Sequence, residues 1–101
     1  MNNMMRQAQA LQRKLADAQE QLAQEEVRGS AGGGMVTVVA TGAGEVRSVT
    51  IAPDVVDPDD IDLLQDMVTA AVNEALRSAK QLESERLGGL AGGLGLPPGL
   101  L

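Results

Sequence analysis

The side chains available for chemistry in this chain are carboxylates, hydroxyls, lysine and arginine, because its 101 residues include no histidine and no cysteine. Without histidine the chain lacks the commonest general base and the commonest transition-metal ligand. Without cysteine it has neither disulfides nor thiolate metal sites. No carboxylate pair, hydroxyl or lysine stands in a recognisable catalytic setting. We therefore predict that the chain is not an enzyme and that it uses no cofactor or metal.

A glycine-rich run at 29–34 invites comparison with a phosphate-binding loop. Such a loop follows a buried strand, and its glycines are followed by Gly-Lys-Ser/Thr. Here a helical pattern precedes the run and Met35-Val36 follows it. We interpret the run as a turn between secondary-structure elements.

The stretch 54–66 holds six aspartates and no basic residue, which raises the question of a calcium site. A calcium-binding EF-hand loop requires an acid at its fifth position and a glycine at its sixth. Counted from Asp57, these positions hold Ile61 and Asp62. We therefore assign the aspartates to helix capping and to a solvated acidic face.

Basic residues on the predicted helices are the remaining candidates for binding. Arg6 and Arg13 lie seven residues apart, so they share one face of a helix. Basic side chains on projecting helices can contact phosphates without contacting bases. The same residues also fit a solvated surface with local ion pairs, such as Arg13 with Asp17 or Arg77 with Glu74. The candidate set for phosphate contact is Arg6, Arg13, Lys14, Arg77, Lys80 and Arg86.

The charge is unevenly distributed. The net charge of −6, from 8 basic and 14 acidic residues, taken alone argues against nucleic acid as a partner. However, residues 1–16 contain three basic residues and no acid, whereas 54–66 is purely acidic. The chain thus has a basic end and an acidic middle.

Two long helices and three strands must position these residues. Apolar residues recur at steps of four and three through residues 3–25, which predicts a helix packed along one narrow stripe. At 1.5 Å per residue this helix is roughly 35 Å long, more than a small core covers. It therefore projects from the body or lies against another chain. Its stripe consists of Met4, Ala8, Leu11, Leu15, Ala18 and Leu22.

The central segment predicts a small antiparallel meander. Strands are expected at 26–31, 35–41 and 45–51, with a hairpin turn at 42–44. In the third strand Val46 falls on one face and Val49 on the other. Either a bulge lies near Arg47–Ser48, or both faces are partly covered. The open edges of so small a sheet favour closure by a second copy.

The second long helix is expected from Pro58 to about Arg86, with Asp57 as its N-cap. Its first half carries apolar residues on most sides, which predicts that this half is largely buried. Residues 88–101 are rich in Gly, Leu and Pro, so we expect a flexible tail. The domain organisation is thus one α+β domain at 1–87 followed by a tail at 88–101.

Composition further bounds the assembly and location. The chain has no Phe, Tyr or Trp, so its core is built from aliphatic residues and gains from burial against a partner. A homodimer is the simplest such partner. No segment has about 18 consecutive apolar residues, and the N-terminus lacks a signal-peptide core. We expect no membrane association, no small-molecule substrate and a location in the cytoplasm.

An ordered series of motifs covers nearly the whole chain: GGMVTV at 33–38, GAGEV at 42–46, VTIAP at 49–53, DMVTAAVNEAL at 66–76 and LPPGL at 96–100. The series resembles the YbaB/EbfC family of bacterial nucleoid-associated proteins, and 66–76 is its most specific part. The resemblance implies an α-β-β-β-α fold and a homodimer whose long helices project as arms. It also implies DNA binding through the two long terminal helices and no catalytic residues.

The sequence as a whole therefore predicts a nucleoid-associated protein, located in the nucleoid, that binds double-stranded DNA as a homodimer. Binding would occur mainly through phosphates and would influence chromosome organisation or gene expression. The alternative is a protein–protein adaptor with weak or indirect DNA association. Its contact surfaces would be the acidic face at 54–66 and the leucine-rich tail.

Overall fold

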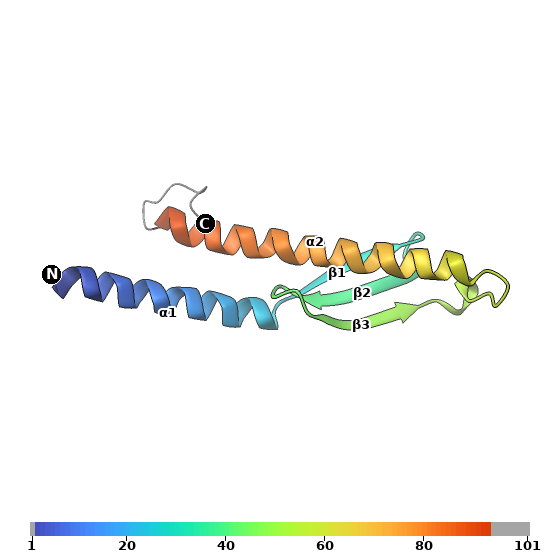
Figure 1. Ribbon diagram of the computed structural model, residues 1–101, viewed down its shortest axis with the longest axis horizontal. Helices are drawn as coiled ribbons and strands as arrows, with labels where there is room; N and C mark the ends of the chain where they lie inside the picture. Colours follow the sequence, from blue (N-terminus) through green and yellow to red (C-terminus); the bar gives the residue numbers. More distant parts are fainter. Residues whose placement is uncertain (1, 94–101) are drawn as a thin grey trace.

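The computed structural model describes residues 2–93 and shows two long helices joined by a three-stranded sheet (Figure 1). A single 3-10 turn, η1, separates the sheet from the second helix. This order confirms the predicted α-β-β-β-α fold. The elements are α1 (Asn2–Gln24), β1 (Glu26–Ala31), β2 (Val36–Thr41), β3 (Val46–Ile51), η1 (Pro53–Val55) and α2 (Ile61–Gly93).

The sheet is antiparallel with strand order β1-β2-β3, as the meander prediction required. Only the second half of the glycine-rich run forms the β1–β2 turn, where Gly32, Gly33 and Gly34 all have positive φ angles. The first half, which includes Gly29, belongs to β1. That backbone conformation is open to glycine and strained for most other residues. These three glycines are therefore explained by the turn.

A bulge on β3 resolves the ambiguity in its pattern. Val39 pairs with Ser48 and Ala40 pairs with Val46, so Arg47 is the extra residue. The bulge rotates Val46 onto the same face of the sheet as Val49. All six residues of β3 are exposed, so partial coverage of both faces, the other explanation considered, does not hold within this chain.

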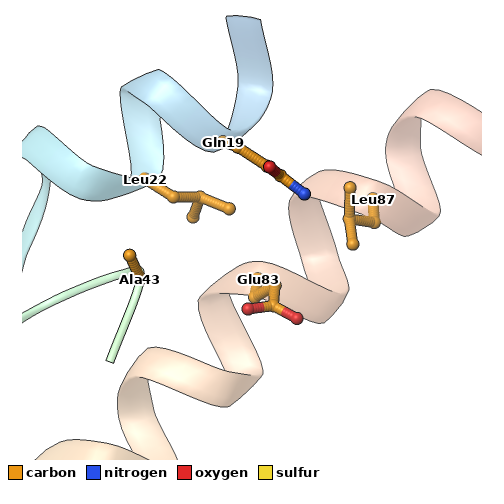
Figure 2. A pocket seen from close by; sticks show the side chains of 5 residues that line it. All are labelled: Gln19, Leu22, Ala43, Glu83 and Leu87. Carbon is orange, nitrogen blue, oxygen red and sulfur yellow. The ribbon is translucent and has the colours of Figure 1, made fainter. Parts of the chain in front are cut away.

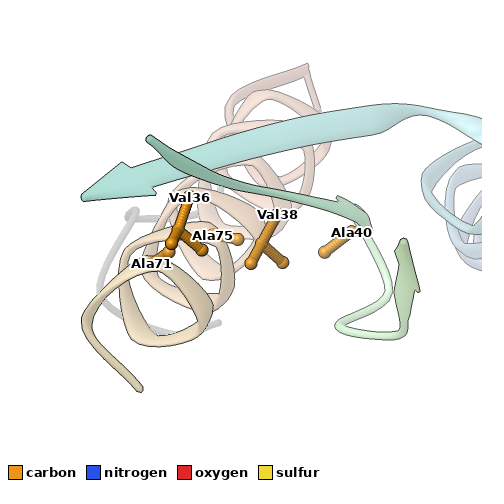
Figure 3. Packing of buried hydrophobic residues seen from close by; sticks show 5 residues of the cluster. All are labelled: Val36, Val38, Ala40, Ala71 and Ala75. Carbon is orange, nitrogen blue, oxygen red and sulfur yellow. The ribbon is translucent and has the colours of Figure 1, made fainter. Parts of the chain in front are cut away.

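The core lies between α2 and the face of the sheet formed by β1 and β2. Val36, Val38 and Ala40 of β2 point toward Ala71 and Ala75 of α2, and all five are fully buried (Figure 3). Small residues on the helix allow it to approach the sheet closely. The long helices extend from this packed region (Figure 1).

The predicted start of α2 was wrong by one turn. Asp57 does not cap the helix: its Oδ1 accepts a hydrogen bond from the Asp59 amide at 2.9 Å and closes a separate turn. Asp60 instead accepts the Leu63 amide at 3.3 Å, so the helix begins at Ile61. Asp60 has a helical amide three residues ahead, which is the geometry of an N-cap. Asp57-Pro58 equally suits the start of a tight turn.

The end of α2 also differs from the prediction, because the helix continues past Arg86 to Gly93. Residues 88–93, expected to belong to the flexible tail, are helical. Each helical glycine costs about 1 kcal/mol relative to alanine, whereas a proline would break the helix. No proline lies between Arg86 and Pro97. The rest of the predicted tail, 94–101, lies outside the described residues.

Burial along the two helices is uneven. On α1, Leu22 is fully buried, Leu11, Leu15 and Ala18 are partly buried, and Met4 is exposed. The first turn of α2 is open, contrary to the prediction of burial on most sides. Ile61 and Leu63 are 45% and 51% exposed, because the single sheet covers only one side of this helix.

The molecule is elongated, with extents of 68 × 22 × 16 Å. The helix α1 runs beside the second half of α2, and both extend away from the sheet (Figure 1). The first turn of α2 lies at the opposite end of the molecule. Within residues 2–93, neither long helix carries an apolar stretch that would let it cross a membrane.

Candidate nucleic-acid interface

The basic residues of α1 lie on its exposed surface. Arg6, Arg13 and Lys14 are all solvent-exposed. Arg6 and Arg13 each follow a stripe residue, Met4 or Leu11, by two positions, a rotation of about 200° on an α-helix. Both therefore point away from the side that faces α2. The sequence pattern had indicated this arrangement, and the structure agrees with it.

The basic residues in the middle of α2 are also exposed. Arg77 is two positions beyond the buried Ala75, so it lies on the outward side of the helix. Lys80 lines a shallow hollow with the β2–β3 turn and Glu83. The five exposed basic residues are thus shared between the two long helices, three on α1 and two on α2.

Arg86 behaves differently from the other five candidates, because it is bound within the chain. Its guanidinium forms an ion pair with Glu25, just beyond α1, and contacts the Gln21 side chain at 3.4 Å. Both members of the ion pair are partly buried. The local pairs considered for Arg13 and Arg77 do not form among residues 2–93, where Arg86–Glu25 is the salt bridge present.

Sequence reasoning missed two further arginines. Arg47 is the bulge residue of β3, and its guanidinium donates to the Ala23 carbonyl of α1 at 3.1 Å. Arg28 of β1 is exposed and pairs with Val39 across the sheet. Its neighbour Gly29 is buried under α2, so Arg28 faces the opposite side. The irregular parity near Arg47 was the only signal in the sequence that this residue was special.

The two charged regions lie at opposite ends of the molecule. The N-terminus of α1 is at one end, and the acidic stretch at 54–66 is at the other (Figure 1). The molecule is 68 Å long, whereas the Debye length at physiological ionic strength is about 8 Å. The acidic end is therefore screened from a ligand bound near the basic end, and the net charge does not decide whether anions bind there.

A cleft of about 350 Å³ separates α1 from α2 near the sheet. Leu22 and Gln19 line it from α1, Glu83 and Leu87 from α2, and Ala43 from the β2–β3 turn (Figure 2). Among the described residues, Glu83 is the one ionisable side chain in this lining. Among residues 2–93 no group of acidic side chains is arranged to hold a metal ion.

Fold and surface together define a small α+β protein that presents basic residues on long helices. A sequence profile of the YbaB/EbfC DNA-binding family matches residues 1–94, and the chain belongs to this family.

Relatives support this assignment at high identity. A nucleoid-associated protein of Acetivibrio thermocellus is 52% identical over 99 residues, which cover 98% of this chain and 88% of the relative. One from Saccharopolyspora erythraea is 52% identical over 100 residues, 99% of this chain and 86% of the relative. The fold matches the crystal structure of an uncharacterized protein from Helicobacter pylori, with a TM-score of 0.73 at 19% identity. That match covers 93% of this chain and 95% of the other.

Proposed function

We propose that this chain is a nucleoid-associated protein that binds duplex DNA as a homodimer, mainly through phosphate contacts and without catalysis. The observation that carries the proposal is the placement of five basic side chains on the exposed surfaces of the two long helices. Membership in a DNA-binding family and the names of the relatives support it. The five residues are Arg6, Arg13, Lys14, Arg77 and Lys80.

The proposed homodimer is supported by an uncovered apolar face on β3. Because of the bulge, Val46, Val49 and Ile51 share the face that α2 covers over β1 and β2, yet α2 makes few contacts with β3. These side chains are 39%, 42% and 37% exposed. An exposed, apolar edge strand is prone to pairing with another chain unless it is covered.

Further exposed apolar residues follow the strand in the sequence. Val56 precedes α2, and Ile61 and Leu63 lie in its first turn, each about half exposed. In a twofold dimer the same surface patch of each chain contacts the other. A second copy packed here would bury the exposed side chains of β3 and those of the first turn of α2. The dimer would then carry two pairs of long helices.

Phosphate contact is the mode of binding that the residue types favour. Without aromatic residues the chain lacks the stacking platform that proteins use for single strands. Arginine and lysine on helix surfaces bind phosphates without reading bases. We infer binding to duplex DNA with little sequence discrimination, a location in the nucleoid, and an influence on chromosome organisation or gene expression.

A gel-shift assay with purified protein at two salt concentrations tests the proposal. Direct phosphate contact predicts a duplex shift that weakens steeply as salt rises. No shift at low salt and micromolar protein would instead favour a protein–protein adaptor. The exposed acidic residues at 54–66 are the observation that keeps this second function in view.

A further inference from the structure

The last turn of α1 is tied to the rest of the molecule by two arginines from distant segments. Arg86 of α2 pairs with Glu25 and contacts Gln21 at 3.4 Å. Arg47 of β3 donates to the Ala23 carbonyl at 3.1 Å. This carbonyl belongs to the helix C-terminus, where carbonyls lack intrahelical partners and a positive charge is favourable.

The position of the Glu25 carboxylate would be energetically unfavourable without the positive charge of Arg86. Its Oε1 pairs with Arg86, while its Oε2 is sealed from solvent and has no hydrogen-bond partner. A carboxylate oxygen in that position relies on the neighbouring guanidinium for compensation. Loss of Arg86 would favour rotation of Glu25 toward water, which would release one tie on α1.

Packing alone holds α1 loosely. Leu22 is its only fully buried residue among those described, and the cleft lined by Leu22 and Leu87 separates it from α2 (Figure 2). From Leu22 to Arg6 is 16 residues, or about 24 Å at 1.5 Å per residue. A rotation of about 10° at the base would therefore move Arg6 by about 4 Å, more than the length of a hydrogen bond.

We propose that Arg86 and Arg47 are positioning residues that fix the direction of α1 and thereby place Arg6, Arg13 and Lys14 against DNA. Two of the eight basic residues thus serve the geometry of the binding surface, and Arg86 does not contact phosphate. The consequence for DNA rests on the proposed function. The consequence for the direction of α1 does not, because it is measured without DNA.

The absence of cysteine makes the direction of α1 measurable by spin labelling. Gln7→Cys on α1 and Gln81→Cys on α2, both exposed, provide a label pair for pulsed dipolar spectroscopy. Labelled chains are diluted with excess unlabelled chain, so that each assembly holds one pair. We expect Arg86→Gln and Arg47→Gln each to broaden the distance distribution. The exposed Arg28→Gln, on the open face of the sheet, should leave it unchanged.

DNA binding separates positioning from direct contact. If the competent orientation falls to about one tenth of the population, the apparent Kd rises about tenfold. In Arg86→Gln and Arg47→Gln, the slope of the logarithm of the binding constant against the logarithm of the salt concentration should equal that of the parent. Every phosphate contact is still made in the complex. Loss of a contacting residue such as Arg13 should instead lower the slope by about 0.9.

Charge exchange provides the decisive variant. Glu25→Arg combined with Arg86→Glu restores the ion pair in reverse, so the narrow distance distribution should return. An Arg86→Gln chain that melts like the parent and keeps its narrow distribution would overturn the proposal. If Arg86→Gln lowers the magnitude of the salt slope by about 0.9 and leaves the distances unchanged, Arg86 contacts a DNA phosphate and is not a positioning residue. If Arg86→Gln does not fold, Glu25→Gln removes the same ion pair and takes its place. If the parent chain binds no DNA, the proposed function fails, but the distance measurement still tests whether the two arginines fix the direction of α1.

Discussion

Gly29 lies where α2 comes closest to the sheet, and the structure sets a definite cost for any side chain there. A Cβ at this position would lie 2.3 Å from the Ala75 nitrogen and 2.4 Å from the Ala71 oxygen. Both neighbours are helix backbone, so neither yields by rotating a side chain. Ordinary contact begins near 3.4 Å, so α2 would have to withdraw by about 1 Å and loosen its packing on β2.

Overpacking of this kind costs about 1–3 kcal/mol, and a backbone clash belongs at the upper end. For a domain of this size the thermal midpoint should fall by about 10 °C or more in Gly29→Ala. The matched control is Gly88→Ala, which makes the same substitution in α2 where the added Cβ meets no atom within 4 Å outside its own stretch of helix. Alanine is the better helix former by about 1 kcal/mol, so this variant should melt above the parent.

Thermal unfolding followed by circular dichroism at one fixed protein concentration measures both variants. Concentration must be held constant because the midpoint of a chain that self-associates, as we propose for this one, depends on it. The reasoning is refuted if Gly29→Ala melts within a degree or two of the parent. A Gly88→Ala chain that melts below the parent would contradict the extension of α2 through residues 88–93.

Two other predictions concern assembly and ligand. Val49→Asp should shift sedimentation equilibrium from dimer toward monomer, while Thr50→Asp, the exposed neighbour on the other face, should remain a dimer; equal behaviour of the two would rule out the β3 face as the interface. A single-stranded oligonucleotide should compete for the protein less well than a duplex of the same length, because no aromatic side chain is available for stacking; better competition by the single strand would disprove phosphate-dominated duplex binding.

Most of the fold could be predicted from the sequence, because helices and strands leave their patterns in short stretches of neighbouring residues. The alternating steps of four and three located α1, and the β-branched run located β2. The start of α2 was misplaced because Asp57 and Asp60 are both good caps, and only the three-dimensional turn decides between them. The first part of the predicted tail, 88–93, was misjudged because a glycine-rich composition weakens a helix without ending it.

The candidate site was predictable only in part. Helical periodicity places Arg6 and Arg13 outward, and this needs no tertiary information. The partner of Arg86 was not predictable, since Glu25 lies 61 residues away and only the folded chain brings them together. The common face of Val46 and Val49 depended on a bulge, which the sequence indicated but did not locate uniquely.

The salt dependence of duplex binding in an Arg6→Ala/Arg13→Ala/Lys14→Ala variant tests the central claim most directly. The control is Gln9→Ala/Gln12→Ala, which changes exposed residues of α1 but keeps its charge. Each lost phosphate contact lowers the log–log slope by about 0.9, so the slope should fall by up to about 2.7 for each α1 that engages DNA. Affinity should weaken alike for all duplex sequences, with the dimer intact. A triple variant that matches the parent at every salt concentration, or that loses one sequence only, would contradict phosphate binding by α1.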